Sequence, residues 1–258
     1  MTTPTTSRDG EHLLDISDLR LQFGNVTALG GATMHARQGE VTAIIGDNGA
    51  GKSSLVKCVL GVNRPTGGTM RFRGEEVTVT SPQHAKELGI EAVFQDLALF
   101  DDLRLWQNMF IGRELRRGVG PLSLLRKKEM ASQADTMVRP LAVNVPDVQR
   151  TVRSMSGGQR QVVAIARAVA WGSELVIMDE PTAALGVRER TEVEELVLRL
   201  RAEGRSFLLI SHSFDQVMKL ADAVWVMRQG RAVANRRVAD TSGQELVALV
   251  TGAKEAEL

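Results

Sequence analysis

The sequence predicts an α/β fold built around a parallel sheet, and three observations lead to this prediction. Apolar runs of strand length recur along the 258-residue chain, for example at 41–45 (VTAII), 174–179 (ELVIMD) and 206–210 (SFLLI). Segments with helical periodicity follow such runs, as at 159–170 and 188–204. Turn-forming stretches rich in glycine separate the two kinds of segment. Strands that alternate with helices in this way are typical of a parallel sheet covered by helices.

The chain up to residue 95 predicts short strands on both sides of a helix. GG (30–31) and QG (38–39) have the composition of turns between the first three strands. SPQHAKELG (81–89) has the capping serine and the terminal glycine of a short helix. The elements expected here are strands at 13–23, 32–37 and 40–45, a helix at 52–60, two short strands within 69–79, the helix at 81–89 and a strand at 90–95.

A helical insert is predicted after residue 95, where charged segments with helical periodicity occupy 103–117 and 124–141, with GVGPL (118–122) between them. The α/β pattern then returns with a helix at 159–170, a strand at 174–179, a helix at 188–204, a strand at 205–211, a hairpin at 223–234 and a closing helix at 243–251. The expected domains are a flexible tail (1–11), a core in two parts (12–95 and 151–235), a helical subdomain (96–150) and a C-terminal helix with tail (236–258).

The composition argues against several classes of protein. Lys and Arg number 32 and Asp and Glu 31, a net charge of +1, so charge gives no reason to expect nucleic acid as a partner. The single cysteine, Cys58, excludes an internal disulfide, and its place on a helix predicts a buried apolar residue. No signal peptide is evident, and no apolar run approaches the roughly 18 residues of a membrane span. We therefore expect a soluble, cytoplasmic protein.

GDNGAGKS (46–53) follows the apolar run 41–45 and fits the pattern G-x-x-x-x-G-K-[ST]. Such a loop directs backbone N–H groups at a polyphosphate, above the positive end of the next helix. Lys52 would neutralise the β and γ phosphate oxygens, and Ser53 would offer its hydroxyl to Mg²⁺. The alternative is a plain strand-to-helix turn, which accounts for Gly46 but not for the order Gly51, Lys52, Ser53.

Two later motifs complement this loop. Asp179 and Glu180 follow the strand at 174–179, at the sheet edge where ligands collect; the first carboxylate would hold Mg²⁺ through water and the second would activate the attacking water. Their alternative is a simple strand end. MSGGQRQ (155–161) places Ser156 and two glycines at the start of a helix, a second site suited to an anion, or alternatively a plain helix cap.

GDNGAGKS, Gln95 after VF, SGGQ, LVIMDE and His212 in LLISHSF occur in that order. This set resembles the ATP-binding subunits of ABC transporters, over roughly residues 13–235. The resemblance implies a P-loop NTPase (RecA-like) core with an N-terminal antiparallel β subdomain and an inserted α-helical subdomain. It also implies ATP and Mg²⁺ as cofactors, and two such subunits stacked head to tail, each SGGQ closing over ATP held by the other's loop.

Further roles are implied residue by residue. Phe23 matches an aromatic residue that stacks on adenine, or else it belongs to a strand core. Gln95 matches a residue that touches Mg²⁺ or the attacking water, and His212 matches a switch histidine at the γ-phosphate; either could instead be structural. Gly186 stands where this family commonly has aspartate, which puts contacts across the dimer in doubt. The implied catalytic residues are Glu180, His212 and Gln95, and the implied metal ligands are Ser53, Gln95 and Asp179.

The residues implied to contact the nucleotide are Phe23, Gly46, Asp47, Asn48, Gly49, Ala50, Gly51, Lys52, Ser53, Ser54, Ser156, Gly157, Gly158 and Gln159. Segments 80–103, 108–114 and 179–190 resemble those of ATPases of monosaccharide importers of the ribose, xylose and fructose type. The resemblance implies a second ATP-binding subunit, which we expect to be a copy of this chain and which could also be a different subunit. It further implies a polytopic membrane permease and, indirectly, a solute-binding protein. The subunit would then lie at the inner face of the cell membrane.

The permease is expected to dock at 96–114, where Leu103, Trp106 and Phe110 recur at helical spacing or else only fill the core of the insert. Asp101, Asp102 and Arg104 are therefore the better residues with which to test docking. Three other functions stay open: import of another small solute, export, and soluble ABC-type ATPase work on DNA or ribosomes. A binding module without catalysis would have lost Lys52 or Glu180, and both are present.

Overall fold

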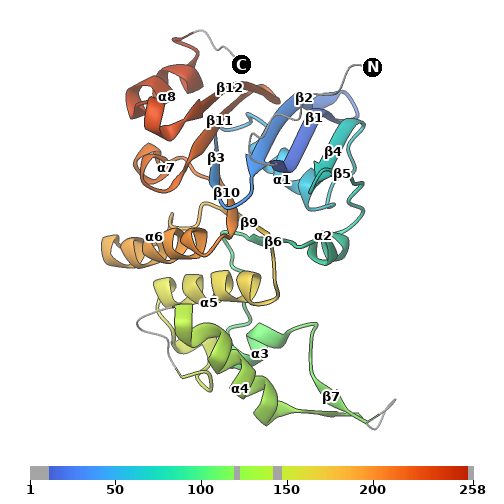
Figure 1. Cartoon of the computed structure of the whole chain (residues 1–258), viewed down its shortest axis with the longest axis vertical. Coiled ribbons are helices and arrows are strands. Elements are labelled where there is room, and N and C mark those ends of the chain that lie inside the picture. The colour runs from blue at the N-terminus through green and yellow to red at the C-terminus, as the bar shows by residue number, and fades with distance from the viewer. Residues whose placement is uncertain (1–11, 119–122, 142–146, 255–258) are drawn as a thin grey trace, which may run out of the picture. The chain divides into compact units, whose positions relative to one another are not determined.

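A computed structural model describes residues 12–118, 123–141 and 147–254 (Figure 1). The expected N-terminal tail (1–11), most of the GVGPL segment and the last four residues lie outside the described residues. The chain forms two compact units. The first comprises Met1–Glu91, Glu174–Met178 and Leu200–Leu258, and the second comprises Ala92–Ser173 and Asp179–Arg199. The predicted domain boundaries stay a prediction.

The N-terminal part of the first unit is an antiparallel sheet with the strand order β2-β1-β4-β5. Its strands are β1 (His12–Phe23), β2 (Val26–Arg37), β4 (Gly67–Phe72) and β5 (Glu75–Glu76). The predicted turn at Gly30–Gly31 is wrong, because both glycines lie inside β2 and the chain reverses at 24–25 instead. The register between β1 and β2 shifts at Ile16/Leu19, and a side chain at Gly31 would collide with Asp18. Gly31 has a φ of 104°, so glycine is needed there for the backbone conformation at this bulge and not for a turn.

The central sheet has the strand order β12-β11-β3-β10-β9-β6. These strands are β3 (Val41–Ile45), β6 (Ile90–Val93), β9 (Leu175–Asp179), β10 (Ser206–Ile210), β11 (Ala223–Arg228) and β12 (Arg231–Arg237). β3 pairs in parallel with β10 and β11, and β11 forms the predicted antiparallel hairpin with β12. Every residue of β3 and β10 is buried, as expected for strands in the middle of a parallel sheet.

The helices of the first unit are α1 (Lys52–Val59), α2 (Pro82–Leu88), α7 (Phe214–Leu220) and α8 (Gly243–Thr251), with a short 3₁₀ turn at Val238–Asp240. Ser81 caps α2 and Gly89 ends it in the left-handed region, as the sequence predicts. Cys58 is buried in α1, and burial raises the pKa of its thiol to about 11, which confirms an apolar role. The sequence analysis missed α7.

The second unit contains α3 (Leu105–Phe110), α4 (Lys127–Val138), α5 (Gly157–Ala170) and most of α6 (Val187–Ala202). 3₁₀ turns occupy Arg139–Leu141 and Val152–Ser154. Helices α3, α4 and α5 pack on one another. The predicted helix over 103–117 is partly wrong: α3 ends at Phe110, Gly112 has a φ of 72°, and β7 (Arg116–Arg117) then pairs with β8 (Leu124–Leu125).

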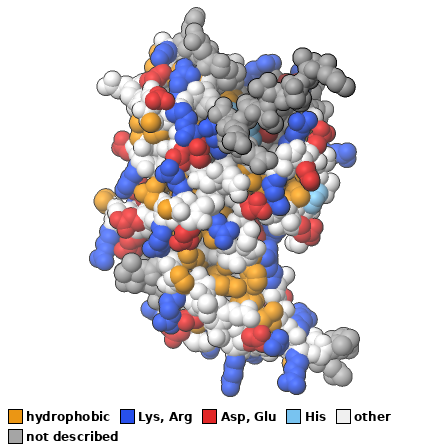
Figure 2. Space-filling model, in the orientation of Figure 1, with side chains coloured by type: hydrophobic (Ala, Val, Ile, Leu, Met, Phe, Trp, Pro, Cys, Tyr) orange, Lys and Arg blue, Asp and Glu red, His pale blue; other side chains and the backbone are white. Residues whose placement is uncertain are grey.

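The apolar residues of α3 belong to the core of the second unit. Trp106 is 6% exposed and Phe110 1%, and the Phe110 ring meets Trp171 edge-on with centroids 5.1 Å apart. The core interpretation of Trp106 and Phe110 is therefore correct, whereas Leu103 lies before α3 begins. On the face drawn in Figure 2, basic and acidic side chains are interspersed, in line with the balanced charge of the sequence.

Candidate active site

The first group of predicted site residues lies in the loop between β3 and α1, in the first unit. Three of its glycines have positive φ: Gly46 (152°), Gly49 (81°) and Gly51 (100°). Gly51 is the N-cap of α1 and supplies no side-chain cap, so the first N–H groups of the helix are available to a bound anion. Asp47, Asn48 and Gly49 are exposed at the loop crest, whereas Ala50 is buried. This geometry suits a polyphosphate cradle.

Two of these glycines are also required by the fold. A Cβ on Gly46 would overlap the carbonyl oxygen of Met227, and one on Gly51 would lie 2.9 Å from the carbonyl oxygen of Ala28. A Cβ on Gly49, by contrast, would meet nothing within 4 Å. The loop is therefore packed against β2 and β11 at both ends and open to ligand in the middle.

Lys52 lies along the inside of this loop. Its ammonium group donates to the carbonyl oxygens of Gly46 at 2.6 Å and Asp47 at 3.0 Å, and the residue is only 7% exposed. Backbone carbonyls hold the charge of the lysine beside the anion-ready end of α1, and phosphate oxygens can replace those carbonyls as partners. Ser53, the next residue, is exposed at the start of α1, while Ser54 is half-buried.

His212 lies two residues beyond β10, which pairs in parallel with β3. The carboxyl ends of β10 and β3 therefore lie at the same edge of the sheet, and the phosphate loop begins at that edge. His212 is exposed, and its two neighbours fix the backbone around it. The Ser211 hydroxyl donates to Gln216 at 2.8 Å, and Ser213 caps α7 by accepting from the N–H of Gln216.

Phe23 ends β1 opposite Val26, and the two side chains are 53% and 65% exposed. The alternative that Phe23 is a strand core residue is wrong. Its exposed ring, at the tip of the β1–β2 hairpin, is accessible to a flat aromatic ligand such as adenine.

Three further predicted residues lie in the second unit. Gln95 is exposed and follows the end of β6 by two residues. Asp179 is the last residue of β9, and Glu180 follows with a φ of 50°, a left-handed conformation rare outside glycine. Strained backbone of this kind is concentrated at functional sites, because only surrounding structure can hold it.

Ser156 is the N-cap of α5 and forms a reciprocal capping box. Its hydroxyl accepts from the N–H of Gln159 at 3.3 Å, and its own N–H donates to the side chain of Gln159 at 3.1 Å. Ser156 and Gly157 are exposed, whereas Gly158 is buried. The expected cap is therefore present, and it holds the serine at an exposed helix N-terminus.

A carboxylate of the same unit lies against this cap. Glu189 is in the first turn of α6, and a Cβ added to Gly158 would fall 2.9 Å from its Cβ and 3.0 Å from its Cγ. Hydrogen bonds from the Ser156 hydroxyl, and then from the backbone N–H groups of Gly158 and Gly186, hold the pKa of Glu189 below its usual value. The Gly186 bond is 3.4 Å long.

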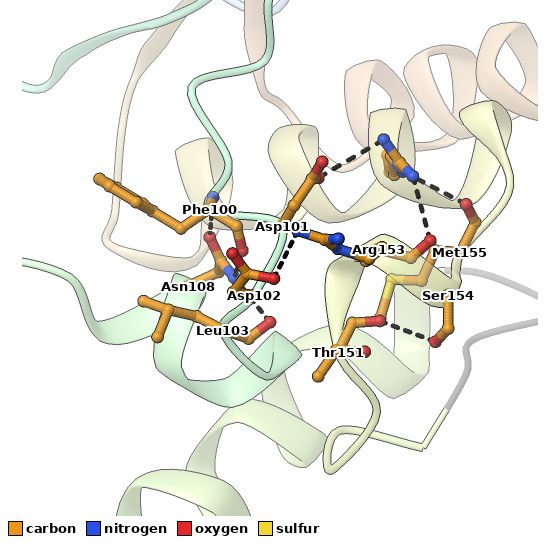
Figure 3. A network of polar contacts seen from close by, with 10 residues as sticks. Phe100, Asp101, Asp102, Leu103, Asn108, Thr151, Arg153, Ser154 and Met155 are labelled. Atoms are coloured by element: carbon orange, nitrogen blue, oxygen red, sulfur yellow. Dashed lines mark hydrogen bonds and ion pairs between the residues drawn. The ribbon is translucent and has the colours of Figure 1, made fainter.

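The loop expected to dock a permease is bonded to the segment that leads into Ser156 (Figure 3). Arg153 pairs with Asp102 at 2.6 Å and donates its N–H to the carbonyl oxygen of Asp101 at 2.9 Å. Arg160 pairs with Asp101 at 3.5 Å and donates to the carbonyl oxygens of Met155 and Arg153, both at 3.2 Å. These contacts connect the turn around 100–104 to the start of α5.

Asn108 holds the same turn from inside. It is fully buried, accepts from the N–H of Phe100 at 2.8 Å and donates to the carbonyl oxygens of Phe100 and Arg104 at 3.0 and 3.2 Å. A buried amide with this many partners fixes the backbone of the turn. Phe100 itself is 57% exposed on the outer side.

Sequence reasoning missed five of the residues described above. The Ser213–Gln216 spacing is the S-x-x-Q capping box and could have revealed α7. Glu189 stands three residues after Gly186, also at capping-box spacing, but that spacing does not indicate a contact with Ser156. Nothing in the local sequence marks Asn108 or Arg160. Asn108 bonds to backbone groups of the nearby turn, which any sequence supplies, and Asp101, the carboxylate that pairs with Arg160, is distant along the chain.

Taken together, the strand, glycine loop and helix with an inward lysine define a P-loop nucleotide-binding protein of the α/β class. The sequence profile of one family, described as ABC transporter, matches residues 29–183, which is more than half of the chain. The chain belongs to the ABC transporter family, and the fold predicted from the sequence is confirmed.

The comparison with curated proteins covers nearly the full length of the chain. The xylose/arabinose import ATP-binding protein of Sulfolobus acidocaldarius is 40% identical over 239 residues, 93% of this chain and 94% of that protein. The fructose import ATP-binding protein of Rhizobium meliloti is 42% identical over 249 residues, 95% of this chain and 96% of that protein. The ribose import ATP-binding protein of Jannaschia is 40% identical, but the match spans only 47% of its length.

Solved structures agree with the fold. A nucleotide-free ATP-binding cassette from an ABC transporter superposes with a TM-score of 0.78 at 27% identity, covering 92% of this chain and 95% of that one. Within the described residues, no helix is long and apolar enough to cross a membrane.

Proposed function

We propose that this chain is the ATP-hydrolysing subunit of an ABC-type importer of a small carbohydrate, namely a monosaccharide. One observation carries the proposal: two proteins named for import of xylose/arabinose and of fructose match almost end to end at 40% and 42% identity. The retained lysine, SGGQ and tandem acidic residues support hydrolysis over mere binding.

The chemistry assigns a task to each residue. The N–H groups of the 46–53 loop hold the phosphates, Lys52 offsets the charge that develops between the β and γ phosphates, and Phe23 stacks on adenine. Glu180 takes a proton from the attacking water, and His212 contacts the γ-phosphate. Positioned charges lower the activation barrier of hydrolysis more than any other contribution, because phosphoryl transfer needs little covalent chemistry from the protein.

Mg²⁺ suits the oxygen donors available, because it prefers hard oxygen ligands and retains several waters. The exposed hydroxyl of Ser53, the Gln95 side chain and the carboxylate of Asp179 would hold it. When bound, the ion would neutralise phosphate charge.

The nucleotide site is shared by two subunits in this proposal. Each SGGQ segment (156–159) closes over the ATP that the partner's 46–53 loop holds, which explains why one chain carries two anion-ready helix N-termini. The permease docks on the turn at 100–104, and the pair works at the inner face of the cell membrane. The solute-binding protein meets only the permease.

The shared site is tested by dimerisation. Glu180→Gln keeps size and hydrogen bonding but cannot accept the proton, so hydrolysis should slow by a factor of roughly 10² to 10⁴ while ATP stays bound. Size-exclusion chromatography with Mg·ATP, or with ATP and EDTA, should then show a shift from monomer to dimer. Adding Ser156→Arg should abolish the shift, with ATP still bound by each subunit's own loop. A double variant that dimerises as readily as Glu180→Gln would reduce Ser156 to a helix cap.

The sugar is tested in a reconstituted transporter. The chain, its permease and its solute-binding protein should together hydrolyse ATP faster when a cognate pentose or hexose is added to proteoliposomes. Stimulation by a non-sugar solute instead would support import of another small molecule. Hydrolysis and function without any permease would support the soluble, non-transport alternative.

A further inference from the structure

The hydrogen-bond donors of the SGGQ segment (156–159) are already bonded to a carboxylate of the same chain. The carboxylate of Glu189 accepts hydrogen bonds from the hydroxyl of Ser156 and from the backbone N–H of Gly158. Its methylene groups lie directly against Gly158, so closely that an alanine there would collide with them. This contact places a negative charge on two donors of the segment that, in the proposed function, closes over the partner's ATP.

We propose that Glu189 is a competitor for the γ-phosphate: it holds the signature donors in the single subunit and must be displaced before the ATP sandwich closes. The inference rests on the proposed function, since it requires that SGGQ receives the partner's nucleotide. It adds a residue that no motif assigns and that sets how much ATP the dimer needs.

The donor count makes the competition unavoidable. A serine hydroxyl has one proton to donate, so Ser156 can bond to Glu189 or to a phosphate oxygen but not to both. The N–H of Gly158 likewise has a single proton. A carboxylate at this position also repels an incoming phosphate, because like charges within a few ångströms disfavour one another. Dimer closure therefore includes the cost of breaking the Glu189 bonds.

The Glu189 carboxylate can be displaced from the SGGQ donors because only the carboxylate end of the side chain is hydrogen-bonded to them. It lies in the first turn of α6, immediately after the segment 183–186 that carries Gly186 in place of the family's usual aspartate. Glu189 is half-buried and not enclosed, so its side chain can rotate into solvent without moving the helix. At Gly186 itself, an added Cβ would meet nothing within 4 Å.

The simplest alternative is that Glu189 only caps α6, since it also accepts from the N–H of Gly186 at 3.4 Å. Glutamine separates the two roles. In a capping box glutamine replaces glutamate at this position, so the cap survives Glu189→Gln. The negative charge does not survive, and hydrogen bonds to a neutral acceptor are roughly half as strong as those to a carboxylate.

The experiment measures the ATP concentration at which half of the Glu180→Gln protein is dimeric, by analytical ultracentrifugation. Adding Glu189→Gln should lower that concentration by about 3- to 10-fold, as expected when charge-assisted bonds become neutral ones. Glu192→Gln is the matched control, because it removes the same charge one turn further along α6, where Glu192 pairs with Arg188. The control should leave the midpoint unchanged, and ADP affinity of the isolated subunit should be the same in all three proteins.

Each result bears on one of the two claims. If Glu180→Gln alone does not dimerise with ATP, the shared site of the proposed function fails. If it dimerises and Glu189→Gln leaves the midpoint unchanged or raises it, Glu189 is a cap and the competition is refuted. An equal fall with Glu192→Gln would likewise refute it, because general repulsion between subunits would then be the cause. Thermal melting of Glu189→Gln checks that the variant is folded.

Discussion

Replacing Gly46 by alanine should destabilise the first unit much more than the same change at Gly49, although both glycines belong to one loop. A Cβ at Gly46 would overlap the carbonyl oxygen of Met227 and lie 3.1 Å from its carbonyl carbon, and both are backbone atoms that cannot rotate away. A Cβ at Gly49 meets nothing within 4 Å. Alanine at either position bears the cost of a positive φ, which is 152° at Gly46 and 81° at Gly49.

The magnitudes follow from these two differences. The left-handed conformation costs about 1 kcal/mol for alanine, and this is the whole expected effect at Gly49. At Gly46 the overlap adds about 2 kcal/mol or more, as in overpacked cores. For a chain of this size 1 kcal/mol corresponds to roughly 2–4 °C in melting temperature, so about 3 °C is expected for Gly49→Ala and about 9 °C for Gly46→Ala.

Thermal unfolding followed by circular dichroism, without nucleotide, measures both shifts. ATP binding supplies the complementary readout: Gly49→Ala should remain folded and lose affinity, because its methyl group points into the open part of the loop. Equal melting temperatures for the two variants, or a Gly46→Ala protein within 2 °C of the parent (about 1 kcal/mol or less), would refute the reasoning.

Three further predictions concern single sites. Lys52→Ala should abolish ATP turnover in a phosphate-release assay, because the β and γ phosphates lose their main side-chain counterion, and turnover within about twofold of the parent would contradict the loop assignment. Cys58, whose thiol pKa is about 11, should resist alkylation at pH 8 in the folded protein and react once the chain is unfolded in urea; rapid labelling of the native state would show an exposed thiol. Charge reversal at Asp101, Asp102 and Arg104 should impair transport and co-purification with the permease, while ATP-driven dimerisation of the free subunit controls for damage to their internal bonds; unchanged transport and co-purification would remove the docking assignment.

Local signals in the sequence were enough for much of the fold. The apolar run 41–45 is a fully buried strand, and Ser81 and Gly89 cap α2 as predicted. The helix caps depend on contacts within a few residues. The burial of a strand depends on how many of its faces are covered, and a continuous apolar run indicates that both are. The phosphate-loop pattern belongs to the same category, because its φ angles and its helix cap are local.

Errors arose where a local signal had a distant cause. Gly30–Gly31 has the composition of a turn, yet Gly31 is required by its φ of 104° inside β2, opposite the register shift of the neighbouring strand. Residues 113–117 carry helical periodicity, but pairing of Arg116–Arg117 with Leu124–Leu125 decides their conformation. The intrinsic preference of a residue for helix or strand is weak, and pairing with a distant strand overrides it.

The sequence by itself determined the family and the order of the motifs, and it predicts the phosphate-binding residues, since each depends on residue types at fixed spacing. Only the tertiary structure decided that Gly46 serves packing whereas Gly49 faces outward, that Asn108 closes the turn at 100–104, and that Glu189 lies against Ser156. Met227 is far along the chain from Gly46, and Glu189 is far from Ser156, so the free energy of these contacts exists only after the chain has folded. The bonds of Asn108 span fewer residues, but they too form only when the turn at 100–104 has its folded shape. No periodicity in the sequence records these contacts.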